Sequence, residues 1–173
     1  NAFFPPASRH VLFFGHVGCG KTTELRQYAR KLNQSKRYLV VEVDVVEKLD
    51  RNNLQYADVM VAMAERLLEE LERVGAAAES VSILPLYQWF TTTLVERTEH
   101  RDFSAEIQTS VEAGGGLPGL LKLLGKFTTA FKTGATYKKQ WREEIRNDFT
   151  KLVSYFNTLI QQAEEALKAA GRA

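Results

Sequence analysis

The chain has 173 residues, of which 45% are hydrophobic and 25% charged, and its formal net charge is +2. This length allows one domain with a sizeable core, and the near-neutral charge excludes a protein that binds nucleic acid through its overall charge. No apolar run approaches the roughly 20 residues that cross a bilayer, and the single cysteine, Cys19, excludes an internal disulfide and fits a reducing, cytoplasmic compartment.

The first predicted elements are two strands with a helix between them. Val11–Phe14 (VLFF) is wholly apolar, as expected for a strand covered on both faces of a parallel sheet. The segment GHVGCGKTT follows, and a helix is predicted from about Lys21 to Leu32. Arg37–Val46 (RYLVVEVDVV) is rich in valine and predicts a second strand. Strand, helix and strand predict a βαβ unit, and therefore an α/β fold with a partial parallel sheet.

The rest of the chain is predicted to be largely helical. A helix is expected from near Tyr56 to near Gly75, with an apolar stripe at three- and four-residue steps: Tyr56, Met60, Met63, Leu67 and Leu71. A second helix is expected over Leu86–Glu99. A third is expected from Leu120 to about Lys132, with Leu120, Leu124, Phe127 and Phe131 on one face. A long helix is predicted from about Lys138 to Ala170, with Gly171 as its C-cap.

Two basic stretches in this helical region have alternative interpretations. GLLKLLGKFTTAFK, which ends at Lys132, fits a membrane-surface or partner-binding helix, but core packing with outward lysines is the favoured interpretation. YKKQWREEIR, which ends at Arg146, fits a nucleic-acid contact. The glutamates within it favour a solvated face with salt bridges instead.

The loop before the first helix carries the strongest functional signal. Gly15, Gly20, Lys21 and Thr22 satisfy the P-loop pattern G-x-x-x-x-G-K-[ST]. Glycines let successive N–H groups point inward as an anion-binding nest, and the helix N-terminus faces the same place. Lys21 is expected to reach the β- and γ-phosphates of ATP in a catalytic role, and the Thr22 hydroxyl to bind Mg²⁺. The predicted binding residues are Gly15, His16, Val17, Gly18, Cys19, Gly20, Lys21, Thr22 and Thr23.

Four further residues are candidates for a chemical role. Cys19 lies at a helix N-terminus, where a thiolate is favoured, but a small loop residue without chemistry is the preferred interpretation. His16 is likewise interpreted as a loop residue. Glu42 and Asp44 lie on one side of the second predicted strand, near the end where ligands bind in open α/β sheets. They are candidates for organising Mg²⁺ or acting as a base, but capping by Asp44 and solvent exposure of Glu42 is the favoured interpretation.

The segments FFGHVGCGKTTELRQYARKL and RYLVVEVDVVEKLDRNNLQYADVMVAMAERLLEEL resemble bacterial P-loop ATPases of the AAA+/STAND type. The resemblance is complete over the loop, is one of layout over Tyr38–Leu71, and fades beyond about residue 75. In that family a second apolar strand ends in two acids that orient Mg²⁺ and activate water, and no such strand follows residue 46 here. The chain begins at Asn1 rather than Met. We therefore expect the N-terminal part of a larger ATPase, with sensor residues and an arginine finger elsewhere.

These observations predict a nucleotide-binding core over residues 1–75 and a helical insertion or extension over residues 76–173. The predicted function is the binding of ATP, with hydrolysis in the complete protein, as a nucleotide-driven switch or assembly ATPase. The expected partners are a nucleoside triphosphate and a second protein or further copies of the chain. Two alternatives stay open: a small-molecule or nucleotide kinase that uses Glu42 or Asp44, and a scaffold with ATP as a structural ligand.

Overall fold

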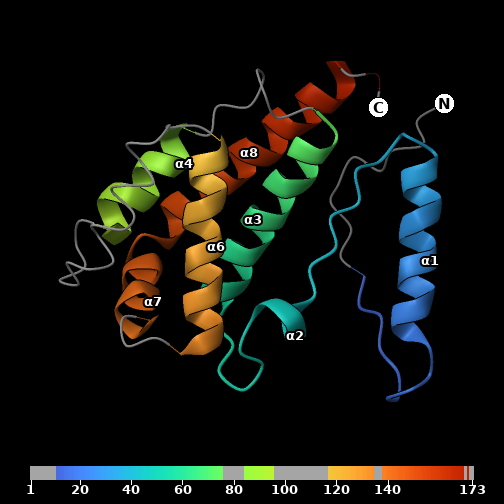
Figure 1. Cartoon of the computed structure of the whole chain (residues 1–173), viewed down its shortest axis with the longest axis horizontal. Helices are drawn as coiled ribbons and strands as arrows, with labels where there is room; N and C mark the ends of the chain where they lie inside the picture. Colours follow the sequence, from blue (N-terminus) through green and yellow to red (C-terminus); the bar gives the residue numbers. More distant parts are fainter. Residues whose placement is uncertain (1–10, 76–83, 96–116, 135–137, 170, 172–173) are drawn as a thin grey trace. The chain divides into compact units, whose positions relative to one another are not determined.

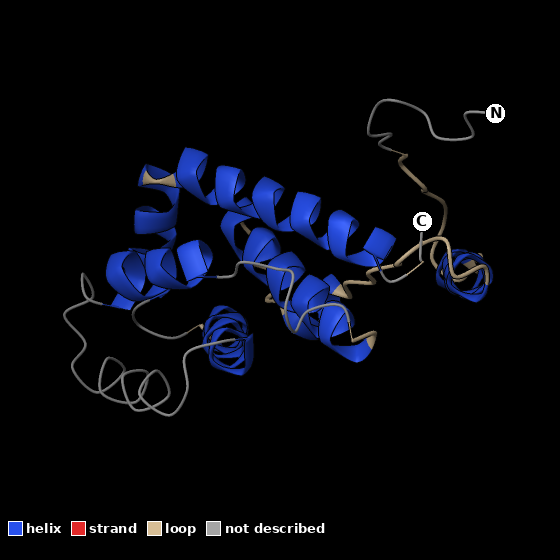
Figure 2. Ribbon diagram, turned by 90° about the horizontal axis from the view of Figure 1, so that it is seen from above, coloured by secondary structure: helices blue, strands red, loops and turns tan. Residues whose placement is uncertain are grey.

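The computed structural model describes residues 11–75, 84–95, 117–134, 138–169 and residue 171. Every regular element of these residues is a helix (Figure 1), and Figure 2 shows no strand among them. In chain order the elements are α1 (Lys21–Gln34), α2 (Val45–Lys48), α3 (Tyr56–Arg73), α4 (Leu84–Trp89), the π-helix η1 (Phe90–Val95), α6 (Leu117–Thr133), α7 (Lys138–Asn147) and α8 (Phe149–Ala169). The chain contacts form two compact units, Asn1–Val40 and Val41–Ala173.

The predicted α/β fold is wrong for the residues that the structure describes. Val11–Phe14 forms no strand, and its side chains are 53% to 84% exposed. Arg37–Val46 also forms no strand. Its last two residues begin α2, because the Asp44 carboxylate accepts hydrogen bonds from the N–H groups of Val46 and Glu47. A strand is stable only where neighbouring strands pair with its N–H and C=O groups, and the described residues supply no sheet for either segment to join.

The correction extends to the family assignment. The resemblance to P-loop ATPases of the AAA+/STAND type implies a parallel sheet with the glycine-rich loop at a strand end. Without that sheet the described residues do not form a P-loop NTPase core, and the classification as AAA+ or STAND is overturned. What does hold is the helix after the loop, since α1 begins at Lys21 as predicted and continues to Gln34.

The second unit is built around the pair α3 and α6, which lie side by side (Figure 1). Helix α3 begins at Tyr56 as predicted, but its buried apolar face is Ala57, Val61, Ala64, Leu68 and Leu71. Of the predicted stripe, Leu71 is fully buried, whereas Tyr56 is 47% and Met63 is 38% exposed. Small side chains on this face allow close packing. On α6, a Cβ added to Gly125 would lie 3.4 Å from Oε1 of Glu65 in α3.

The buried face of α6 matches the prediction. Leu120, Leu124, Phe127 and Phe131 are all completely buried. The Phe127 ring meets Trp141 of α7 edge-on at 4.3 Å between centroids and Phe90 of η1 at 5.5 Å, and such aromatic contacts stabilise beyond their buried area. Core packing therefore accounts for this basic stretch. No helix in the described ranges has the length and apolar character to cross a membrane.

Two predicted helices are interrupted. The helix expected over Leu86–Glu99 begins at Leu84 and widens into η1, where the hydroxyls of Thr91 and Thr92 donate to the carbonyl of Gln88 and compete with regular backbone bonding. Residues 96–99 lie outside the described ranges. The long helix expected from Lys138 divides at Asp148 into α7 and α8.

Candidate functional site

The loop before α1 is a compact, exposed turn. Gly18 and Gly20 have φ angles of 84° and 83°, which glycine adopts without strain. The N–H of Cys19 donates to the carbonyl of His16 at 3.3 Å. The two ends of the loop come close together, because a Cβ added to Gly15 would lie 3.0 Å from Sγ of Cys19. Glycine at position 15 therefore leaves room for the Cys19 sulfur, and glycine at the other two positions suits the left-handed backbone.

The Lys21 side chain folds back across this loop. Its Nζ donates to the carbonyl oxygens of Gly15 at 2.7 Å and His16 at 2.6 Å, and contacts Sγ of Cys19 at 3.6 Å. An ammonium group has three donors, and a thiol sulfur is a weak acceptor. The two carbonyl hydrogen bonds thus fix the cation over the loop. Its third contact, with the Cys19 sulfur, is weak, and a hydrogen bond to an anionic oxygen would replace it favourably.

The start of α1 is electrostatically suited to an anion. No side chain in the described part of the chain caps the helix at Gly20, and the first backbone bond of the helix runs from the N–H of Glu24 to the Gly20 carbonyl at 3.0 Å. The leading N–H groups of a helix carry its positive dipole end. The sequence from Val11 to Val40 contains six Lys or Arg residues and one acidic residue, Glu24, for a net charge of +5.

The other predicted loop residues make fewer contacts. Val17 is fully exposed. Thr22 and Thr23 are exposed in the first turn of α1, and within the described residues their hydroxyls have no hydrogen-bond partner. The structure therefore brings together Gly15, His16, Cys19 and Lys21 of the predicted set. It leaves the two threonine hydroxyls accessible at the start of the helix.

The two candidate acids have structural partners in the second unit. Asp44 is the N-cap of α2, with its Oδ1 accepting from the N–H of Val46 at 3.0 Å and of Glu47 at 3.2 Å. Glu42 is exposed, and its backbone carbonyl accepts from Nε of Arg66 at 3.2 Å. These contacts agree with capping and solvent exposure. A role of either carboxylate toward a nucleotide stays a prediction.

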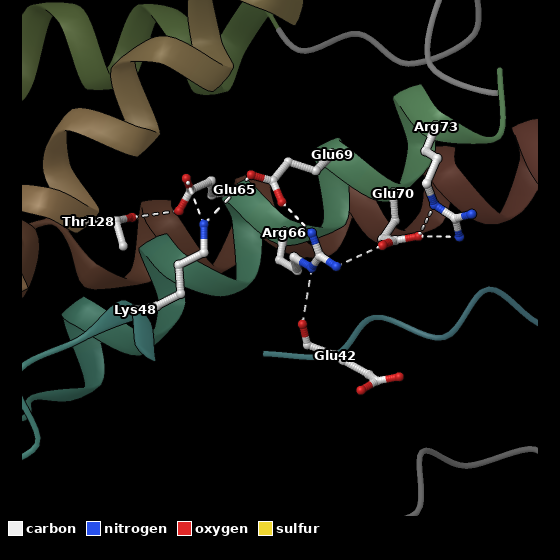
Figure 3. A network of polar contacts seen from close by, with 8 residues as sticks. All are labelled: Glu42, Lys48, Glu65, Arg66, Glu69, Glu70, Arg73 and Thr128. Atoms are coloured by element: carbon white, nitrogen blue, oxygen red, sulfur yellow. Dashed lines mark hydrogen bonds and ion pairs between the residues drawn. The ribbon is translucent and has the colours of Figure 1, made fainter. Parts of the chain in front are cut away.

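A row of ion pairs on α3 holds the preceding segment in place (Figure 3). Arg66 contacts Glu69 at 2.7 Å and Glu70 at 3.1 Å, and Arg73 contacts Glu70 at 2.6 Å. The hydrogen bond that the guanidinium donates to the Glu69 carboxylate, aided by the charge of Glu70, raises the pKa of Arg66 above its usual value. Arg66 is thereby held where it also binds the Glu42 carbonyl. This row anchors chain segments, and nothing in it is arranged as a catalytic pair.

Glu65 links this row to α6. Its Oε2 accepts from the Thr128 hydroxyl at 2.8 Å, and its Oε1 pairs with Nζ of Lys48 at 3.2 Å (Figure 3). The Glu65 side chain is 8% exposed. A buried carboxylate is costly unless it is paired and hydrogen-bonded, so these two partners are what allow a charge inside the α3–α6 contact.

The basic side chains of α7 are divided between interior and surface. Lys138 and Arg142 are buried at 5% and 7% exposure, so the predicted solvated face is wrong for them. Arg142 donates from Nε to Oδ1 of Asp58 at 2.9 Å and from Nη1 to Oδ1 of Asn53 at 2.9 Å. The spacing of the basic residues within α7 carries no sign of these partners, which lie more than 80 residues earlier in the chain.

No family model, no curated protein and no solved structure matches this chain. Its function is therefore inferred from its own residues and their geometry.

Proposed function

We propose that the loop Gly15–Thr23 and the start of α1 bind the phosphate chain of a nucleoside triphosphate together with Mg²⁺. The observation that carries the proposal is the Lys21 ammonium, which two carbonyls of the loop before α1 hold in place, together with a helix start that no described side chain caps. A fixed cation beside free N–H groups is the arrangement that phosphate oxygens need.

Each part of the loop has a definite task in this proposal. The helix N–H groups and Lys21 take the phosphate oxygens, and the Thr22 hydroxyl joins those oxygens in binding Mg²⁺. In the described part of the chain, no cluster of three or more His, Cys, Asp or Glu side chains is arranged to hold a metal ion. Mg²⁺ would therefore arrive with the phosphates rather than occupy a site of its own.

The proposed role is binding. Activation of water requires a carboxylate or another base near the terminal phosphate. Glu24 is the only acidic residue from Val11 to Val40, and it lies on α1 as part of the first helical turn. We therefore limit the proposal to binding, and we expect hydrolysis in the complete protein to draw its base from elsewhere.

Calorimetric titration of the chain with Mg·ATP tests the proposal. Lys21→Ala should weaken binding by about tenfold to a hundredfold, the cost of losing a charge-assisted hydrogen bond. Lys31→Ala is the matched control, because Lys31 is an exposed lysine in the last turn of the same helix. Absence of binding, or equal weakening by both substitutions, would contradict the proposal.

A second comparison tests the metal role of Thr22. Thr22→Val should weaken binding of Mg·ATP but leave binding of ATP without Mg²⁺ nearly unchanged, because only the metal ligand is lost. Thr22→Ser, which keeps a hydroxyl at the same position of the exposed first turn, should change neither. Equal effects of the two substitutions would show that Thr22 does not bind the metal.

A further inference from the structure

A cavity of about 510 Å³ lies beside α7, in the second unit of the chain. Sites for small molecules occupy about 300–1,000 Å³, so this volume suits a small ligand. Four basic side chains and one acidic side chain line it: Lys138, Lys139, Arg142, Arg146 and Glu143. We refer to it as the α7 cavity.

The two inner cations of the α7 cavity are rigidly held. Arg142 is hydrogen-bonded to Asp58 and Asn53, and Lys138 donates to the carbonyl of Phe131 and pairs with Asp50 at 3.5 Å. These contacts tie α7 to the segment before α3 and to the end of α6. Asp58 and Asp50 compensate the two charges, so the inner wall is polar and preorganised rather than strongly positive.

The outer cations are available to a ligand. Lys139 is exposed and forms no ion pair with any residue in the described ranges. Arg146 is 65% exposed, and the ion pair that it makes with Glu143 at 3.5 Å lies on the surface, where such pairs contribute little. Even with the carboxylates of Asp50 and Asp58 counted, the charge around the α7 cavity is positive.

The helix geometry sets the shape of a suitable ligand. Residues 139, 142, 143 and 146 follow the three- and four-residue steps that form one helix face. Lys139 and Arg146 lie seven positions apart on the helix, which is about 10 Å along the axis. The first turn of α7 contains no acidic residue, so the positive end of the helix dipole adds to Lys138 and Lys139 at one side of the cavity. Positive charge thus extends along the cavity instead of meeting at one point.

We propose that the α7 cavity binds a small molecule that carries more than one phosphate group. The concave volume favours a small molecule over a nucleic-acid backbone, and the separated outer cations favour several linked phosphates over a single one. Lys139 and Arg146 supply the free charge, while Arg142 and Lys138 form the fixed wall. This site is separate in sequence from the loop Gly15–Thr23.

The test uses the full chain with Lys21→Ala, so that the glycine-rich loop contributes little, and inorganic tripolyphosphate as the probe in calorimetric titrations. Adding Lys139→Ala and Arg146→Ala should weaken binding about tenfold or more. Adding Lys122→Ala and Lys168→Ala instead, which removes two exposed lysines from α6 and α8, should change it less than about twofold. Glu143→Gln should strengthen binding, because it removes the acidic group found among the described lining residues.

Several outcomes would overturn the proposal. They are no binding of tripolyphosphate to the Lys21→Ala chain, an equal loss in the two double substitutions, and equally tight binding of orthophosphate. Binding of tripolyphosphate to the unsubstituted chain alone would contradict the α7 cavity and leave the loop proposal standing. Because the substituted positions are exposed, we expect the far-UV circular dichroism of every variant to be unchanged. An unchanged spectrum shows that a loss of affinity does not come from unfolding.

Discussion

Replacing Arg142 with methionine should destabilise the helical unit strongly. The substitution keeps most of the apolar stem but removes the guanidinium, which makes two hydrogen bonds to Asp58 and two to Asn53. The Asp58 side chain is 1% exposed, so its carboxylate would stay buried without a counter-charge. Removing one partner of a buried ion pair costs about 3–5 kcal/mol, a large part of a typical total stability of about 5–15 kcal/mol.

Urea unfolding followed by circular dichroism measures this cost, with Arg146→Met as the control. Arg146 is on the same helix but 65% exposed, and its loss should change the free energy of unfolding by less than about 0.5 kcal/mol. Adding Asp58→Asn to Arg142→Met should recover about 1–3 kcal/mol. An asparagine carries no charge and still accepts the hydrogen bond from the N–H of Gln55. A loss below about 1 kcal/mol for Arg142→Met, or a further loss on adding Asp58→Asn, would refute the reasoning.

Two further substitutions test buried polar groups. Thr128→Val removes the donor to the buried Glu65 carboxylate and should cost about 1–3 kcal/mol in urea unfolding. Thr129→Val, whose exposed hydroxyl donates to the Gly125 carbonyl of its own helix, should cost less than about 0.5 kcal/mol. Equal costs would contradict the role of Glu65. The Tyr87 hydroxyl is buried with no hydrogen-bond partner among the described residues, so Tyr87→Phe should raise the free energy of unfolding by about 1 kcal/mol. Burial also raises the pKa of Tyr87, which favours its neutral form in the fold. The original chain should therefore lose stability as the pH rises above about 10, and Tyr87→Phe should lose less; parallel pH profiles would contradict this.

The helices were largely predictable because their signals are local. The periodic apolar residues of 120–131 identified both the helix α6 and its buried face, since Leu120, Leu124, Phe127 and Phe131 are all completely buried. On α3 the same reasoning chose an apolar stripe that lies one position before most of the residues that are buried. Large residues such as Met63 looked like the core, but the structure buries Ala57 and Ala64 because a neighbouring helix packs closely there.

The strands failed for a different reason. Val11–Phe14 and Arg37–Val46 have the composition of buried strands. Composition, however, shows only that a segment is able to pair with a neighbouring strand. Pairing needs neighbouring strands, and none is present among the described residues. The Asp44 side chain shows how helix capping competes with strand formation. A carboxylate that caps two N–H groups turns the valines after it into the start of α2.

By itself the sequence determined the local features: the helix from Lys21, the amphipathic helices of the second unit, and the glycine-rich loop. These features follow from local properties of the chain: the conformational freedom of glycine, the period of the apolar side chains, and the spacing of residues a few positions apart. Only the tertiary structure decided which charges are buried and which are free. Arg142 and Asp58 stand 84 residues apart in the chain, and no local pattern links them. Their pairing, and the cavity whose wall Arg142 helps to form, exist because α7 packs against the start of α3.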